Sequence, residues 1–177
     1  KMQYCYCLFC ETSKCRKVAF LLEKNGLERA FSPQIVRRQR KKGKNIELMF
    51  DLLPGYVFAY SSQPVKEMSQ LKVDGVIRLL GSPENSYCLI EKDQLFALNL
   101  LERNGLIDVL NLLQIGDTVT LSDELFLGHK GKVVQIDYRK QRAKVLFDFA
   151  GVSWNCWVAC NLIFQQYESV STLPFDC

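Results

Sequence analysis

Residues 53 to 58 read Leu-Pro-Gly-Tyr-Val-Phe and lie in the second half of a strand-like stretch that runs from 46 to 60. Upstream, residues 31 to 36 are also extended in pattern, because Pro33 disfavours a helix in the residues around it. Two extended segments joined by a short polar stretch are typical of a β-hairpin. We therefore interpret residues 31 to 60 as a hairpin whose tip lies near residues 37 to 44.

The tip of this hairpin is strongly basic. Residues 37 to 44 read Arg-Arg-Gln-Arg-Lys-Lys-Gly-Lys, with six positive charges and no negative one. The net charge of the chain is +4, and it becomes −2 when these six charges are set aside. Positive charge confined to one place indicates a site for a polyanion. The competing interpretation is a solvated loop that keeps the protein in solution.

The rest of the first 105 residues is predicted to alternate between strands and helices. Further strands or extended segments are expected at 3–10, 76–80 and 87–90. Helices are expected from a cap at Thr12 or Ser13 to a stop at Asn25-Gly26, from 62 to 71, and from 92 to 103. This order predicts an α+β domain over residues 1–105, with one mostly antiparallel sheet and helices packed against it.

The character of the sequence changes after Gly105. Residues 106–114 are apolar and lack the composition of a flexible tether, so they are predicted to form a short linker. Short strands follow at 118–121, 131–138, 143–149 and 153–159. In one of them Ala143, Val145, Phe147 and Phe149 alternate with polar residues. A stable small β-barrel over 115–165, with a tail at 166–177, is therefore expected.

The composition argues against several classes of protein. No apolar run approaches the roughly 18 residues that a membrane span needs, and no export leader is recognisable. Phosphate-cradling glycine loops, paired acids in a motif and nucleophile–histidine combinations are also missing from the sequence. We therefore expect a cytoplasmic, monomeric protein that is not an enzyme, has no cofactor and does not bind membranes.

The chain holds eight cysteines, of which four lie at its start: Cys5, Cys7, Cys10 and Cys15. Free cysteine on a strand behaves as a small hydrophobic residue, which fits a reduced compartment. Cys7-x-x-Cys10 has a spacing that structural zinc sites use, but successive strand residues point to opposite faces. Cys156-x-x-x-Cys160 also lies in a predicted strand. The sequence therefore predicts no metal site.

Three stretches in order resemble the NusG family of transcription factors. The first is Tyr4-Cys-Tyr-Cys-Leu-Phe-Cys, followed by a helix with Val18-Ala19. The second is residues 53 to 58, similar to a Phe-Pro-Gly-Tyr-Val signature with leucine in the first position. The third is Gly-Asp-Thr-Val at 116–119 with Phe-Leu-Gly-His-Lys-Gly-Lys-Val-Val at 126–134 and Ile-Asp-Tyr at 136–138, which resembles the KOW motif. A KOW motif alone is also found in ribosomal proteins.

The resemblance implies a function that composition does not show. It implies an N-terminal (NGN-like) domain that docks on RNA polymerase during elongation, and a C-terminal KOW β-barrel that binds a ribosomal protein or another factor. The dense basic tip, short apolar linker and cysteine-rich start are features of specialised antiterminators of the LoaP and RfaH type. These members are recruited by a nucleic-acid signal. The alternative within the family is a general elongation factor without such recruitment.

The resemblance also suggests where partners bind. Phe9, Tyr56 and Phe58 match positions of the polymerase-docking surface, although aromatic residues on strands more often pack in a core. Lys14, Arg16 and Lys17 begin a helix that, in related factors, faces non-template DNA; their other interpretation is an ordinary solvated helix face.

The predicted nucleic-acid contacts on the hairpin are Arg37, Arg38, Arg40, Lys41, Lys42 and Lys44. If both basic surfaces bind one ligand, an RNA hairpin is favoured over single-stranded DNA, because a folded stem presents phosphates in more than one direction.

Three further residues have structural predictions. His129, the only histidine, is expected in a turn, and Gly131 is expected to supply a backbone conformation that other residues avoid. Trp154 and Trp157 lie three apart in a strand and are expected on opposite faces, so that one is core and the other free to meet a partner.

Overall fold

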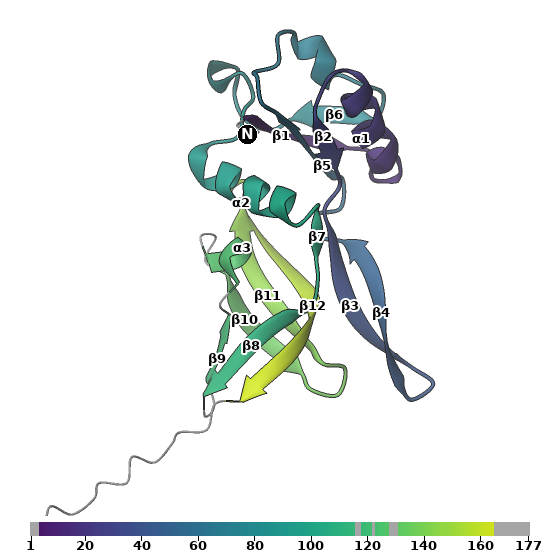
Figure 1. Cartoon of the computed structure of the whole chain (residues 1–177), viewed down its shortest axis with the longest axis vertical. Coiled ribbons are helices and arrows are strands. Elements are labelled where there is room, and N and C mark those ends of the chain that lie inside the picture. The colour runs from purple at the N-terminus through teal and green to yellow at the C-terminus, as the bar shows by residue number, and fades with distance from the viewer. Residues whose placement is uncertain (1–3, 116–117, 122, 128–130, 165–177) are drawn as a thin grey trace, which may run out of the picture.

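The computed structural model describes residues 4–115, 118–121, 123–127 and 131–164. A four-stranded sheet forms the centre of the N-terminal part, which we define as residues 4–107 (Figure 1). Its strands in spatial order are β2 (Arg29–Phe31), β5 (Tyr56–Ser61), β1 (Tyr4–Cys10) and β6 (Val76–Leu79). All three neighbouring pairs are antiparallel, as the sequence predicts for this part of the chain.

Helix α1 (Cys15–Lys24) packs on one face of this sheet. Its predicted apolar stripe is confirmed, because Cys15, Val18, Ala19 and Leu22 are all buried. They share a core with Leu8, Val57 and Leu71. The predicted cap is wrong: Thr12 and Ser13 belong to a 3₁₀ turn, η1 (Thr12–Lys14), and α1 starts after Lys14 without a side-chain cap.

The other face of the sheet contacts helix α2 (Glu91–Glu102), which lies close to the predicted 92–103. Phe96, Ala97 and Leu100 of α2 are fully buried with Cys7 and other residues of the sheet. The hydroxyl of Tyr60 donates a hydrogen bond of 2.7 Å to the Ala97 carbonyl, which ties the helix to β5.

The predicted hairpin with a basic tip is present but shorter than the predicted residues 31 to 60, because residues 56 to 61 form β5 in the four-stranded sheet. Strands β3 (Gln34–Lys41) and β4 (Lys44–Asp51) pair antiparallel up to Lys41 opposite Lys44. The two-residue turn between them has φ of 48° at Lys42 and 80° at Gly43. A turn with positive φ at both central positions matches the right-handed twist of the two strands that it connects. The tip therefore projects as an ordered β-ribbon.

A five-stranded sheet forms the C-terminal part, which we define as residues 110–164 within the described ranges. In spatial order its strands are β10 (Lys132–Asp137), β11 (Arg142–Phe149), β12 (Val152–Phe164), β8 (Leu110–Ile115) and β9 (Thr118–Leu121). All four predicted strands are present. A short helix, α3 (Glu124–Leu127), was not predicted.

The segment predicted as a linker is itself β-structure. It contains β7 (Leu106–Ile107), which pairs parallel with β3, and β8, which pairs parallel with the end of β12. Strand β12 is longer than predicted because its last five residues, 160 to 164, form this pairing. Each of these two pairings makes its sheet mixed, whereas the four-stranded sheet is antiparallel throughout.

Two other predicted elements differ from the structure. The helix expected at 62–71 is only a 3₁₀ turn, η2 (Met68–Leu71). Side chains hold this segment instead: Gln70 accepts hydrogen bonds from the Lys66 and Glu67 amides, and the Tyr6 hydroxyl accepts one from Val65. The segment expected to be extended at 87–90 makes one bridge to β1, after the 3₁₀ turn η3 (Pro83–Asn85).

The two parts share one hydrophobic core. A single cluster of buried residues includes Phe58 and Phe96 from the N-terminal part and Phe147 and Val158 from the C-terminal part. Figure 1 shows α2 between the N-terminal sheet and the strands β11 and β12. We call this packing of the C-terminal sheet on the N-terminal part the closed arrangement. Among the described residues, no helix has the length and apolar composition to cross a membrane.

Gly131 has a different role from the predicted one. It is not among the residues with positive φ. Instead, a Cβ atom at this position would lie 2.3 Å from the Cβ of Phe126, whose carbonyl accepts a 2.8 Å hydrogen bond from the Gly131 amide. The position needs glycine because Phe126 of α3 approaches it closely.

Candidate functional site

Aromatic rings join the two parts of the chain. We define the aromatic joint as Tyr56, Phe58 and Phe96 from the N-terminal part with Phe147, Phe149 and Trp154 from the C-terminal part. Phe96 lies 5.8 Å from Phe147 and 5.0 Å from Phe149, between ring centroids. Phe58 lies 5.6 Å from Phe149, and Tyr56 meets Trp154 edge-on at 5.6 Å. Aromatic pairs at these separations contribute beyond simple burial.

The residues predicted to dock on polymerase lie at this joint. Phe58 is fully buried, and Tyr56 is only 8% exposed beneath Trp154. Phe9 is half-buried beside Tyr56, at 5.3 Å, with the Arg78 guanidinium 5.7 Å from its ring. In the closed arrangement, Tyr56 and Phe58 therefore contact the C-terminal sheet in place of any external partner.

Polar contacts also fasten the two parts. Arg103, just after α2, makes a paired contact with the Asp123 carboxylate at 3.0 and 2.8 Å. Both side chains are partly buried. Arg38 on β3 donates to the carbonyl of Cys160 at 2.9 Å and to the Asn161 side chain at 3.2 Å. These arginines connect elements that are distant in the sequence, so they help to define how the two parts fit together.

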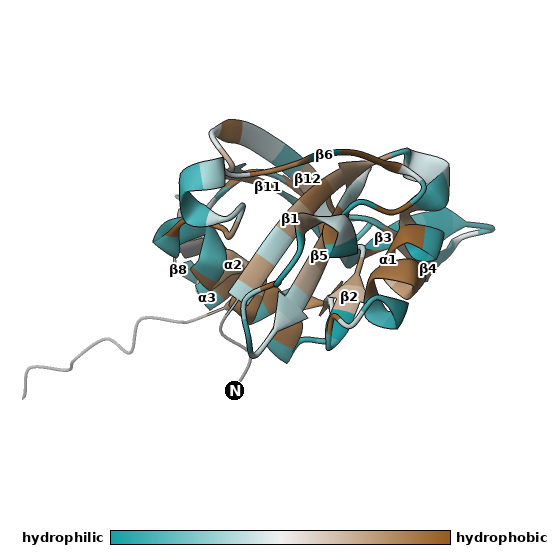
Figure 2. Cartoon of the chain, turned by 90° about the horizontal axis from the view of Figure 1, so that it is seen from above, coloured by the Kyte–Doolittle hydropathy of each residue, from teal (hydrophilic) through white to brown (hydrophobic). Residues whose placement is uncertain are grey.

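The six cations of the hairpin fall into two groups. Arg37 lies over the Phe50 ring at 4.6 Å, and the Arg38 side chain is only 12% exposed and paired with Glu47 at 2.9 Å. The remaining four are exposed and form no ion pair with another described residue: Arg40, Lys41, Lys42 and Lys44. The free positive charge is thus concentrated in the last residues of the tip. Figure 2 shows this end of the hairpin as a hydrophilic projection.

The three cations predicted at the start of α1 are not equivalent. Lys14 pairs with Glu11 at 3.0 Å, and Lys17 pairs with Asp74 at 2.7 Å. The hydrogen bond that Lys14 donates to Glu11 raises the pKa of Lys14, and the hydrogen bond that Asp74 accepts from Lys17 lowers the pKa of Asp74. Arg16 is exposed and has no ion pair with another described residue. It is therefore the cation of this group whose charge is available to a ligand.

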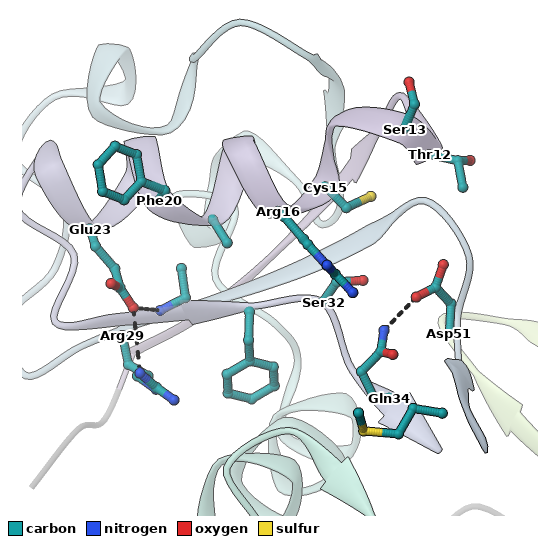
Figure 3. A pocket seen from close by; sticks show the side chains of 14 residues that line it. Thr12, Ser13, Cys15, Arg16, Phe20, Glu23, Arg29, Ser32, Gln34 and Asp51 are labelled. Carbon is teal, nitrogen blue, oxygen red and sulfur yellow. Dashed lines mark hydrogen bonds and ion pairs between the residues drawn. The ribbon is translucent and has the colours of Figure 1, made fainter. Parts of the chain in front are cut away.

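Arg16 borders a groove of about 640 Å³ between α1 and the strands β2, β3 and β4. Figure 3 shows its side chain extending from α1 toward Ser32 and Gln34. The Ser32 hydroxyl is buried and has no hydrogen-bond partner. At the far end, Glu23 accepts a hydrogen bond from the Ala30 amide. Arg16 and Ser32 both line the groove, and of the two it is Arg16 that is exposed.

The cysteines contribute to the core. The seven described cysteines are free thiols. Cys7 belongs to the core on the α2 side of the sheet and Cys10 to the core under α1, so their predicted placement on opposite faces of β1 is confirmed. Within the described ranges, no group of three or more metal-ligating side chains comes together. Burial raises the pKa of Cys5, Cys10 and Cys156 to about 12.

These three thiols are expected to resist alkylation in the native protein. At pH 8 a thiol with a pKa near 12 holds about 10⁻⁴ of its population as thiolate, the reactive form. Iodoacetamide labelling followed by peptide mass spectrometry should give slow modification of Cys5, Cys10 and Cys156. Labelling should become fast in denaturant. Native modification of Cys10 at the rate of a free thiol would contradict the buried placement.

The two tryptophans occupy opposite faces, as the sequence predicts. Trp154 faces the shared core, and its indole Nε1 donates to the Phe149 carbonyl at 3.4 Å. Trp157 lies on the outer face, 4.5 Å beneath the Arg142 guanidinium. The sequence did not predict three residues that join the two parts: Arg103, Asp123 and Trp154. The residues around each of them in the sequence do not indicate a partner in another part of the chain. His129 lies outside the described residues.

Comparison with known proteins follows the same division of the chain. The family model described as transcription termination factor nusG matches residues 3–99. The transcription termination/antitermination protein NusG of Rickettsia conorii is 32% identical over 108 residues, which are 59% of this chain and 56% of that protein. NusG of Rickettsia typhi is 29% identical over 113 residues, or 63% and 59%. The chain thus spans less than two thirds of the length of these relatives.

The fold resembles a solved structure described as domain interaction in Thermotoga maritima NusG. The TM-score is 0.53 at 17% identity, and the match covers 90% of this chain and 94% of that one. At this identity the likeness concerns the fold, and it extends over both parts of the chain. Because the family model covers more than half of the residues, including all of α1 and most of α2, this chain belongs to the NusG family.

Proposed function

We propose that this chain is a non-enzymatic transcription elongation and antitermination factor that works in the cytoplasm. It docks on RNA polymerase through Phe9, Tyr56 and Phe58, and an RNA hairpin bound by its basic tip directs it to particular transcripts. In this proposal the N-terminal part is NGN-like, the C-terminal sheet is KOW-like, and the chain resembles the specialised LoaP and RfaH type. The names of its Rickettsia relatives, transcription termination/antitermination proteins, support the proposed role in transcription.

The observation that supports RNA binding is the positive charge of the hairpin tip, which no acidic residue in the described part of the chain compensates. Arg40, Lys41, Lys42 and Lys44 lie in and beside the two-residue turn of the hairpin, and none forms an ion pair with another described residue. Each cation that meets a phosphate releases counterions, so binding is favourable and depends on salt. Arg37 and Arg38 instead serve the fold, through Phe50 and the Cys160 carbonyl. We therefore assign phosphate contacts to the four outer cations.

Arg16 supports a second contact with the same ligand or with non-template DNA. Its guanidinium is free of ion pairs among the described residues and borders the groove that ends at Ser32. Guanidinium groups can bind phosphate or stack on a base. Lys14 and Lys17 are engaged by Glu11 and Asp74, so they contribute less net charge to this surface.

Polymerase docking requires the aromatic joint to open. Tyr56 and Phe58 are covered by Trp154 and Phe149, so a partner reaches them only after the C-terminal sheet moves away. The released sheet would then present Phe149 and Trp154 to a different protein, such as a ribosomal protein. The closed arrangement thus keeps both binding surfaces covered until polymerase competes for one of them.

The alternative is a general elongation factor of the same family that needs no RNA signal. Such a factor shares the aromatic surface and has no need for four unpaired cations on a projecting turn. The two functions differ in one measurable property, which is tight and salt-dependent binding to a folded RNA.

The test is a titration of the full chain with a folded RNA hairpin and with single-stranded DNA at several salt concentrations. Replacing Arg40, Lys41, Lys42 and Lys44 by alanine is expected to reduce the slope of log affinity against log salt by about 3, since each contact contributes roughly 0.7–0.9. The matched control removes four exposed cations elsewhere: Lys24, Lys66, Lys72 and Lys92.

The control variant should bind RNA with nearly the same slope as the unmodified chain, because its charges lie away from the tip. Equal slopes for the control and tip variants would favour the general elongation factor. If the tip variant has a reduced slope with single-stranded DNA and an unchanged slope with RNA, the recruiting signal is non-template DNA.

A further inference from the structure

The turn between β10 and β11, residues 138–141, lies against the basic hairpin. The Asn45 side chain of β4 donates to the Arg139 carbonyl at 3.3 Å. Gln141 is 3.5 Å from Arg38, and its carbonyl accepts a 3.0 Å hydrogen bond from the Cys160 amide. These contacts hold the turn beside the hairpin, although nearly a hundred residues separate the two elements in the sequence. Figure 1 shows the hairpin running alongside the C-terminal sheet.

Both elements carry cations beside this contact. Arg40 is the cross-strand partner of Asn45, so the two side chains project to the same face of the hairpin, the face that meets the turn. Arg139 is exposed and forms no ion pair with another described residue. Lys140 lies 3.8 Å from Asp137, a carboxylate that also pairs with Arg142 at 3.3 Å. One acid therefore offsets two cations, and net positive charge remains on the turn.

We propose that the hairpin tip and this turn form one composite basic site for the phosphate backbone of a double-stranded RNA stem. The site consists of Arg40, on the hairpin face that meets the turn, with Arg139 and Lys140, and it adjoins the outer tip cations Lys41, Lys42 and Lys44. The inference rests on the proposed function of the hairpin and extends the RNA site to the C-terminal part. Like charges brought together without counter-charges repel one another, and a bound polyanion removes that repulsion.

The arrangement of groups favours a duplex over a single strand. Binding of single strands depends on aromatic side chains on which successive bases stack. Near this site the exposed aromatic residue is Tyr138, at 58% exposure, and the hairpin tip itself has none. Cations on two separate β-turns instead match phosphates on the two sides of a groove, which a stem presents by its shape.

The composite site has a consequence for the closed arrangement. Arg40 and the turn that carries Arg139 and Lys140 lie side by side only while the C-terminal sheet packs on the N-terminal part. A stem bound across both turns therefore stabilises that packing, because a ligand stabilises the state that binds it best. Opening of the aromatic joint divides the site, so RNA is held more weakly once polymerase has displaced the C-terminal sheet.

The experiment measures binding of a 20-base-pair RNA stem to the full chain over a range of salt. The double variant Arg139→Ala with Lys140→Ala is compared with the control Lys66→Ala with Lys72→Ala, which removes two exposed cations elsewhere. The turn variant is expected to lose about 1.5 in the slope of log affinity against log salt, while the control is unchanged. Circular dichroism and a melting curve verify that each variant is folded.

A charge-neutral variant tests the joining of the two turns. Asn45→Ala removes the hydrogen bond to Arg139 and no charge. If Asn45 positions the turn, this substitution weakens binding to the RNA stem in the unmodified chain and has no added effect in the turn variant. An effect of the same size in both backgrounds would mean that Asn45 itself contacts the RNA, and would overturn its positioning role.

The outcomes separate this inference from the proposed function. Loss of RNA binding in the tip variant with no effect in the turn variant would overturn the composite site and leave the hairpin site intact. If neither variant changes RNA binding, both the hairpin site and the composite site are wrong. Equal affinity for a single-stranded RNA of the same length would overturn the duplex as the partner.

Discussion

Replacing Phe96 by alanine is expected to lower the free energy of unfolding by about 3–5 kcal/mol, the usual cost of removing a large aromatic side chain from a core. Phe96 is fully buried on α2 and contacts Phe58, Phe147 and Phe149. It therefore packs against both parts of the chain at once. Each kcal/mol corresponds to roughly 2–4 °C in melting temperature for a protein of this size.

Thermal and urea unfolding, followed by circular dichroism, measure this loss. Phe20→Ala is the matched control, because Phe20 is 56% exposed on α1 and should shift stability by less than about 0.5 kcal/mol. A shared core also predicts that the whole chain unfolds in one transition, which moves as a unit in the Phe96 variant. If the unfolding curve has two transitions and the Phe96 variant shifts only one of them, the two parts are stabilised independently.

The local pattern of the sequence predicted most elements of the fold. The alternation of Ala143, Val145, Phe147 and Phe149 places these residues on the buried face of β11, where all four are found. The apolar stripe of α1 and the helix near 92–103 follow equally from periodicity. These signals are reliable because each depends only on neighbouring residues and on the geometry of one element.

Features that depend on distant partners were not predicted. The apolar segment at 106–114 has no local sign of strands, since β7 and β8 are formed by parallel pairing with β3 and β12. Similarly, the alternating face of β11 does not reveal that it packs on α2 as well as within its own sheet. Sequence periodicity identifies a buried face and leaves open which element buries it.

The candidate site shows the same limit. The sequence contains six cations near the tip, and the structure divides them by their neighbours. Arg37 meets Phe50, and Arg38 meets Glu47 and the Cys160 carbonyl, so only the other four remain free. The cross-strand register places Glu47 opposite Arg38, whereas contact with Cys160 requires the tertiary fold. A count of charges therefore overestimates the charge that is available to a ligand.

Replacing Trp154 by alanine is expected to strengthen binding to core RNA polymerase by roughly 10- to 100-fold. The substitution removes the edge-on contact with Tyr56 and the hydrogen bond to the Phe149 carbonyl. Losses of about 1.5–3 kcal/mol are typical for an aromatic side chain with this burial. When the competent state is rare, apparent affinity is proportional to its population, so this loss translates directly into tighter binding.

The measurement is the dissociation constant of the full chain for immobilised core RNA polymerase. Trp157→Ala is the matched control, because Trp157 lies on the same strand, faces outward beneath Arg142 and does not touch the aromatic joint. It should bind polymerase like the unmodified chain. Adding Tyr56→Ala to the Trp154 variant should cancel the gain, because Tyr56 is the proposed docking residue that the loss of Trp154 uncovers.

The three variants together decide what the joint does. Tighter binding in the Trp154 variant alone, lost again with Tyr56→Ala, means that the C-terminal sheet competes with polymerase for the same aromatic residues. An increase that survives Tyr56→Ala means that opening the joint exposes a polymerase-binding surface to which Tyr56 does not contribute. Equal affinities for the Trp154 variant, the Trp157 variant and the unmodified chain would contradict the competition. The buried position of Tyr56 and Phe58 would then reflect core packing, the role that aromatic residues on strands most often have.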